Sequence, residues 1–305
     1  AMLLLRVVTA SLIVHHGLEK LKDVPGFSNN VIAAYFPFLP GPPTFWTYLS
    51  AGFEIVGSFC ITVGIFARPA AALLAGTMVN AILFHMMKFG LQGFPFGIPP
   101  KGGAYTFEPS LAFLSVTTYI VFAGPGRFAW RPDFPESLRF LRKRVCTDAA
   151  MLLLRVVTAS LIVHHGLEKL KDVPGFSNNV IAAYFPFLPG PPTFWTYLSA
   201  GFEIVGSFCI TVGIFARPAA ALLAGTMVNA ILFHMMKFGL QGFPFGIPPK
   251  GGAYTFEPSL AFLSVTTYIV FAGPGRFAWR PDFPESLRFL RKRVCTDAAM
   301  LLLRV

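Results

Sequence analysis

The chain repeats a whole domain without change. Residues 1–149 recur as 150–298 with no substitution, and the last seven residues, AMLLLRV, begin a third copy. Solenoid repeats have periods of about 20–50 residues, so this far longer period indicates a duplicated domain. Identical sequences share their local preferences, so one copy predicts the fold of both, and every candidate site occurs twice. We expect one domain at 1–149, an identical one at 150–298 and the start of a third copy at 299–305. The visible chain is expected to be part of a longer polyprotein array or a piece cut from one.

The composition predicts an integral membrane protein. Hydrophobic residues make up 54% of the chain and charged residues only 13%, whereas soluble domains carry about 25% charged residues. The net charge of +11 does not indicate nucleic-acid binding, because the basic residues flank apolar segments as the positive-inside rule describes. The four cysteines form no CxxC or CxxCH motif, which argues against a disulfide framework and attached c-type haem.

Each copy contains four apolar segments that are long enough to cross a bilayer, which takes about 20 residues per helix. In the first copy they cover residues 2–18, 44–67, 69–87 and 106–123. The expected fold is therefore an all-α integral membrane protein of two tandem four-transmembrane-helix bundles. This gives eight spans, together with interfacial helices.

The connecting segments predict the orientation of each bundle. Residues 24–43 contain five prolines and an apolar patch, which is typical of a segment lying on the bilayer, and residues 89–103 form a Gly/Pro-rich loop. The basic tail at 132–145 is expected to be an amphipathic surface helix. Four spans return each copy to its starting face, where eight basic residues fall, against four on the other face. The termini are therefore expected on the cytoplasmic, stromal or matrix side.

Polar residues within the apolar segments are the candidate site residues, because polar groups are costly inside a bilayer. At about 1.5 Å rise per residue, their depths allow one polar belt from mid-membrane to the less basic surface. In the first copy the belt consists of His15 or His16, Glu54, Asn80, His85 and Glu108. In the second copy the same candidates are His164, His165, Glu203, Asn229 and His234.

Three interpretations of the belt remain open. Glu54 could bond to Asn80 or a histidine and simply fix the packing. A histidine could instead bind a metal, a haem iron or the magnesium of a chlorophyll through a neutral imidazole. A quinone head group could also bind histidine and Glu54, which would relay a proton. Glu54 and Glu203 are thus the catalytic candidates, and no residues are assigned to a metal site. Arg6 is expected to snorkel to the basic face.

Three stretches of one copy resemble the DoxX family of four-helix membrane proteins. They are LLLRVVTASLIVHHGLEKL (3–21), AGFEIVGSFCITVGIFARPAAALLAGTMVNAIL (51–83) and FAGPGRFAW (122–130). The family takes its name from a small subunit of a terminal quinol oxidase, and other members are associated with thiosulfate:quinone oxidoreductase. The resemblance implies functional roles for Glu54 and for His15 or His16, and it alone introduces quinones.

The function expected first is a non-catalytic accessory subunit of a membrane redox or photosynthetic, photosystem-like complex. The chain carries no flavin, nucleotide, iron–sulfur or c-haem motif, and tandem arrays are found among algal plastid proteins. This favours a thylakoid or other organellar inner membrane over a bacterial plasma membrane. Partners would be the lipid bilayer and other membrane subunits, and the candidate ligands are chlorophyll with carotenoid, quinone and, ranked lower, haem. The alternatives are a DoxX-like subunit of a quinol oxidase or thiosulfate:quinone oxidoreductase, and a small membrane transporter.

Overall fold

The computed structural model describes residues 1–100, 102–130, 144–249 and 251–279, and every regular element in these ranges is a helix. The first copy contains α1 (Met2–Lys22), α2 (Val24–Phe27), the π-helical turn η1 (Ser28–Ala33), α3 (Pro43–Val63), α4 (Ala67–Phe89) and α5 (Glu108–Ala123). The second contains α6 (Arg144–Lys171), α7 (Val173–Phe176), the π-helical turn η3 (Ser177–Ala182), α8 (Pro192–Val212), α9 (Ala216–Phe238) and α10 (Glu257–Ala272).

The helix ends follow the proline and glycine signals in the sequence. Pro43 occupies the first turn of α3, where its missing N–H costs nothing. Gly64 ends α3 with φ of 89°, and Gly124 ends α5 with φ of 79°, conformations that favour glycine. The Gly/Pro-rich segment after α4 contains no helix in its described part. The predicted tail helix at 132–145 falls mostly outside the described residues, and α6 already begins at Arg144.

Six helices in the described part of the chain are long and apolar enough to cross a membrane: α1, α3, α4, α6, α8 and α9. The segments predicted to give the remaining two spans form α5 and α10, apolar helices of 16 residues each. At about 1.5 Å per residue they reach roughly 24 Å, short of the ~30 Å hydrocarbon core. Length and composition therefore support six of the eight expected spans.

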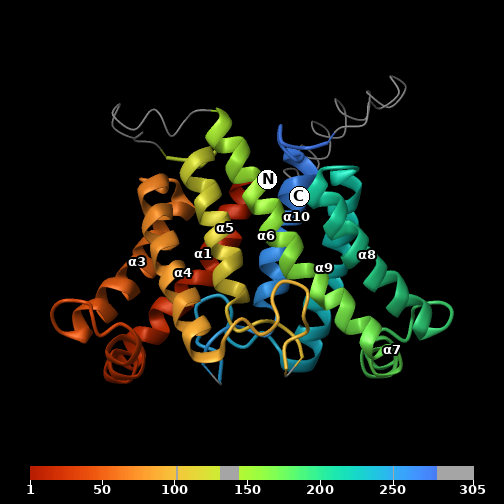
Figure 1. Cartoon of the computed structure of the whole chain (residues 1–305), viewed down its shortest axis with the longest axis horizontal. Helices are drawn as coiled ribbons and strands as arrows, with labels where there is room; N and C mark the ends of the chain where they lie inside the picture. Colours follow the sequence, from red (N-terminus) through yellow and green to blue (C-terminus); the bar gives the residue numbers. More distant parts are fainter. Residues whose placement is uncertain (101, 131–143, 250, 280–305) are drawn as a thin grey trace.

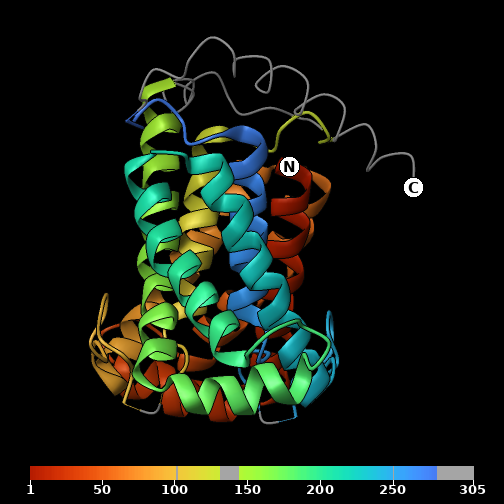
Figure 2. The same ribbon diagram turned by 90° about the vertical axis from the view of Figure 1, so that its right-hand side faces the viewer.

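The long helices stand side by side (Figures 1 and 2), and helices of the two copies pack directly on one another. Within the first copy α1 packs on α3, α3 on α4, and α4 on α5, and the second copy repeats this order. The copies meet where α5 packs on α6 and α1 packs on α10, and α5 and α10 also touch each other. The first helix of each copy therefore packs against the second long helix of its own copy and also against the last helix of the other copy.

A continuous hydrophobic core joins the two copies, because side chains from both belong to one cluster of buried residues. Within this core, the hydroxyl groups of Tyr119 on α5 and Tyr268 on α10 lie 2.7 Å apart and share a hydrogen bond. Burying both tyrosines without this bond would leave polar atoms unsatisfied. The interface between copies is thus built like the interior of a single domain.

Arg6 does not snorkel, contrary to the sequence-based expectation. It is fully buried, and its guanidinium donates a hydrogen bond to the carbonyl oxygen of Phe128, in the segment after α5. The equivalent Arg155 donates to the carbonyl of Ile210, near the end of α8, at 3.1 Å. Because a buried guanidinium needs acceptors, these arginines tie the first helix of each copy to the ends of its neighbours.

Candidate functional site

The paired histidines of α1 meet a glutamate from the other copy. His16 Nε2 lies 2.9 Å from Glu257 Oε1, and His15 Nε2 lies 3.4 Å from Glu257 Oε2. The side chains of His15 and Glu257 are fully buried, while that of His16 is 23% exposed. The contact follows from the packing of α1 against α10, which begins at this glutamate.

The loop before α10 positions the glutamate and contacts side chains near the end of α1. The backbone N–H of Tyr254 donates to Glu257 Oε2 at 3.0 Å, and the Tyr254 ring lies 4.1 Å from the ring of His15. Glu19, one turn beyond the histidines, accepts a 2.7 Å hydrogen bond from the N–H of Gly252. Burial raises the pKa of Tyr254 to about 12, so its hydroxyl stays protonated and donates to the carbonyl of Gly246.

The same arrangement occurs with the roles of the copies exchanged. Glu108, which begins α5, lies 2.9 Å from His165 Nε2 and 3.4 Å from His164 Nε2. Glu168 accepts a 2.7 Å hydrogen bond from the N–H of Gly103 in the first copy. In each cluster the three donor atoms of the histidines and the glutamate lie within 4.8 Å of one another.

The buried carboxylate of the second spanning helix pairs with a lysine. Glu54 on α3 is 2% exposed and forms an ion pair with Lys20, one turn after His16 on α1. Glu203 and Lys169 repeat the pair in the second copy. In one of the three open interpretations Glu54 bonds to Asn80 or a histidine, but its ion-pair partner among the described residues is Lys20. A lysine one turn from the end of α1 can reach back along apolar surface to this carboxylate.

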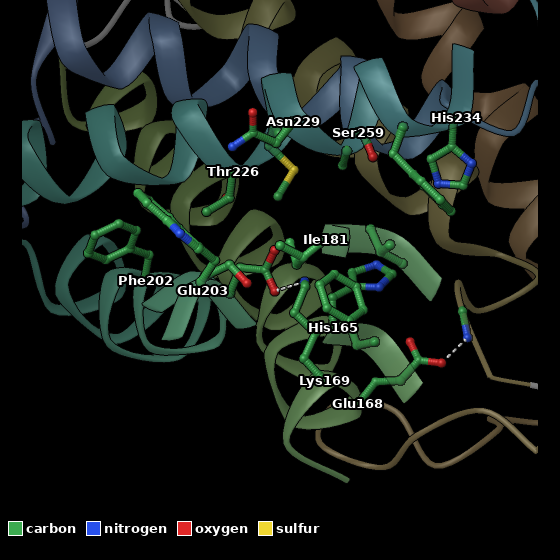
Figure 3. A pocket seen from close by; sticks show the side chains of 18 of the residues that line it. His165, Glu168, Lys169, Ile181, Phe202, Glu203, Thr226, Asn229, His234 and Ser259 are labelled. Atoms are coloured by element: carbon green, nitrogen blue, oxygen red, sulfur yellow. Dashed lines mark hydrogen bonds and ion pairs between the residues drawn. The ribbon is translucent and has the colours of Figure 1, made fainter. Parts of the chain in front are cut away.

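A cavity of about 530 Å³ opens between α6, α8, α9 and the start of α10. Figure 3 shows the candidate residues of the second copy around it, with the Lys169–Glu203 pair below and Asn229 and His234 on the helix above. His165 also lines the cavity. The remaining lining is largely apolar: Phe176, Val180, Ile181, Phe185, Leu188, Trp195, Leu198, Phe202, Met227, Phe233 and Phe262. An apolar cavity with a few polar groups is the usual form of a small-molecule site.

The structure therefore divides the predicted belt in two. In the second copy, His165, Glu203, Asn229 and His234 surround one cavity, whereas His164 is absent from its lining and faces Glu108 of the first copy. His15, His16, Asn80 and His85 occupy the corresponding positions of the first copy.

Sequence reasoning missed Lys20 and the pairing across copies. The signal for Lys20 was its position four residues after His16 on the same helix face. Sequence carried no signal for the pairing, because a contact within one copy and a contact between identical copies involve the same residue types.

Comparison with known proteins identifies the family. The sequence profile of DoxX matches residues 1–87 and again 150–236, which together make up more than half of the chain. The chain belongs to the DoxX family. Each match covers the first three long helices of a copy, so Glu108 and Glu257 lie outside the matched residues. Family membership and the apolar helices together make this an integral membrane protein in contact with lipid.

Two relatives support this assignment. A Bacillus subtilis (strain 168) protein named "Putative oxidoreductase CatD" is 31% identical over 95 residues, which cover 31% of this chain and 66% of that protein, just under two thirds of its length. An "Uncharacterized protein" of Haemophilus influenzae is 34% identical over 128 residues, covering 41% of this chain and 84% of that protein. These shares make each relative close in length to one copy. No solved structure matches the chain.

Proposed function

We propose that this DoxX-family protein is a quinone-binding subunit of a membrane redox complex. The observation that carries the proposal is the cavity, which combines apolar walls with the Lys169–Glu203 pair and His165 at one side. A quinone needs these two environments, because its ring carbonyls accept hydrogen bonds and its tail is apolar. The name of the Bacillus subtilis relative supports a redox role in the family.

The polar side chains suit the chemistry of a quinone head group. The Lys169 ammonium and a protonated His165 nitrogen are donors that can bond to the ring carbonyls. Reducing a quinone to a quinol takes two electrons and two protons. The electrons would be exchanged with a redox centre of a partner subunit, while Glu203 and His165 pass protons at the carbonyl oxygens. The subunit thus serves binding and proton transfer within a larger assembly.

We also propose that α5 and α10 lie within the bilayer, which gives eight spans. Both helices pack against spanning helices on either side and against each other, so neighbouring helices cover much of their surface. The excess of basic residues at the ends of each copy favours placing that face in the cytoplasm, stroma or matrix.

Lipid extraction of the natively purified chain tests the proposal directly, and chromatography of the extract is expected to yield a quinone. Chlorophyll or carotenoid in its place would replace the proposal with the photosynthetic accessory role and a thylakoid location. Extracted protein should then bind a short-chain ubiquinone analogue saturably, with quenching of tryptophan fluorescence, because Trp195 lines the cavity.

A matched pair of variants locates the site. The double variant Glu54→Gln/Glu203→Gln should bind the analogue about tenfold more weakly, equivalent to ~1.4 kcal/mol, because it removes the partner that holds each lysine in place. Asp148→Asn also removes carboxylate charge, but Asp148 lies in the first turns of α6, near Arg276 and away from the cavity, and should leave the affinity unchanged. Equal affinities for all three proteins would refute this site.

A further inference from the structure

We propose that each cluster of two histidines and one glutamate binds a divalent transition-metal ion, with ligands drawn from both copies. One site consists of His15, His16 and Glu257, and the other of Glu108, His164 and His165. Imidazole nitrogen and carboxylate oxygen together suit ions such as Zn²⁺ and Fe²⁺. This inference goes beyond the quinone proposal and does not depend on it.

The distances within each cluster fit one shared ion. Zinc binds histidine nitrogen and carboxylate oxygen at about 2.0–2.2 Å, so two ligand atoms on one ion lie about 2.9–3.5 Å apart. His16 Nε2 lies 2.9 Å from Glu257 Oε1 and His15 Nε2 lies 3.4 Å from Glu257 Oε2, so both separations fall in this range and suit a carboxylate that binds the ion through both oxygens. Both nitrogens are Nε2 atoms, which histidines commonly present to metals.

The direction of the two rings is unusual for neighbours on a helix. Consecutive helical residues point about 100° apart and do not normally face each other. Here the ring centroids of His15 and His16 lie only 4.0 Å apart, and both Nε2 atoms approach the same carboxylate. The side chains are thus arranged around a common point rather than spread over the helix surface.

The charges within the cluster favour a cation. Glu257 is fully buried, and its ion-pair partners within the described ranges are two imidazoles, which bind metals in their neutral form. A buried carboxylate is stabilised by a counter-charge or a bound metal, and without either it takes up a proton. The backbone N–H of Tyr254 holds this carboxylate in place, as outer-shell hydrogen bonds do around metal ligands.

One side of each ion would remain open for another ligand. Three protein ligands leave at least one coordination position free, which is typical of reactive rather than structural metal sites. His165 borders the 530 Å³ cavity, and the side chains of His16 and His165 are each 23% exposed. An ion held by Glu108, His164 and His165 would therefore lie next to the cavity.

Metal analysis of the full chain tests the inference without any quinone. Protein in detergent is stripped with a chelator, reloaded with Zn²⁺, desalted and analysed by mass spectrometry for zinc per chain. We expect two zinc ions per chain in the unmodified protein and none in Glu108→Gln/Glu257→Gln. The control Glu54→Gln/Glu203→Gln removes two other buried carboxylates and should retain both ions. Unmodified protein without zinc, or equal loss in the control, would overturn the proposal.

A second pair of variants tests the pairing across copies. His16→Gln/Glu257→Gln damages only one of the proposed sites and should keep one zinc ion. His16→Gln/Glu108→Gln damages both sites and should keep none. If each site formed within one copy, the two results would be reversed, which would refute the shared ligand set.

A spectroscopic measurement avoids dependence on the folding of variants. Unmodified protein loaded with Co²⁺ should show the intense d–d absorption of cobalt held by imidazole and carboxylate in a low-coordinate site, and Zn²⁺ should displace it. A spectrum identical to that of aqueous Co²⁺ would overturn the proposal, whether or not the protein binds quinone.

Discussion

Gly17 on α1 lies where α1 and α3 approach each other closely. A Cβ atom at this position would lie 2.7 Å from Ile55 Cγ1 and 2.9 Å from the backbone oxygen of Ala51. Favourable carbon–carbon contacts lie at about 3.5–4.0 Å. Gly17→Ala would therefore force the two helices apart by several tenths of an ångström, because the Ala51 oxygen belongs to the backbone of α3 and cannot rotate away.

The expected loss in the free energy of unfolding is the difference between two opposing effects of Gly17→Ala. Overpacking a well-packed interior costs about 1–3 kcal/mol, while replacing a helical glycine by alanine returns about 0.5–1 kcal/mol. Gly17→Ala should thus lower the free energy of unfolding by about 0.5–2 kcal/mol. The double variant Gly17→Ala/Gly166→Ala should lose about twice as much, because Gly166 has the equivalent contacts with Ile204 and Ala200.

Unfolding in mixed detergent micelles, followed by circular dichroism over increasing SDS, measures this loss. Gly76→Ala on α4 is the matched control, because in the described part of the chain no atom beyond its own stretch of helix lies within 4 Å of the added Cβ. This variant should be neutral or slightly more stable. The added Cβ at Gly17 would also lie 3.1 Å from Glu54 Cβ, so quinone affinity should fall together with stability. If Gly17→Ala proves as stable as Gly76→Ala, Gly17 is not required for the close packing of α1 on α3.

Two further predictions use the same unfolding assay. Tyr119→Phe should lower the free energy of unfolding by about 1–3 kcal/mol, because it leaves the buried Tyr268 hydroxyl without its partner. The double variant Tyr119→Phe/Tyr268→Phe leaves neither hydroxyl buried and should be closer in stability to the parent. A double variant less stable than the single variant would contradict this. Lys20→Met should cost about 3–5 kcal/mol by leaving the Glu54 carboxylate uncompensated, and adding Glu54→Gln should recover most of the loss. Independent, additive effects at positions 20 and 54 would show that the ion pair contributes nothing to stability.

The helices were predictable because their signals are local. Apolar length determines which segments cross a bilayer, and Pro43, Gly64 and Gly124 end or begin helices through their own backbone preferences. The predicted segments accordingly overlap the long helices, although α1 extends a full turn further to Lys22 and α3 ends a full turn earlier at Val63. In the second copy, α6 already begins at Arg144, before the predicted segment. The environment of Arg6 was not predictable, because its buried acceptor on Phe128 lies 122 residues away in sequence.

The candidate site was only partly accessible from sequence. Depth along each helix is a local property, and it placed His165, Glu203 and Asn229 in one predicted belt; in the structure these three side chains line one cavity. The rotation of each helix is not local, because it depends on which neighbours the helix packs against. The lysine partner of Glu54 and the separate environment of His164 both follow from that rotation.

The sequence by itself determined that this protein is a helical membrane protein made of two identical copies. Local hydrophobicity and backbone preferences suffice for that. The tertiary structure alone decided that His15 and His16 face Glu257 rather than Glu108. Both glutamates have the same neighbours in sequence and the same chemistry, so no sequence pattern separates them. Only the packing of α1 against α10 selects one of the two, and with it a site that both copies share.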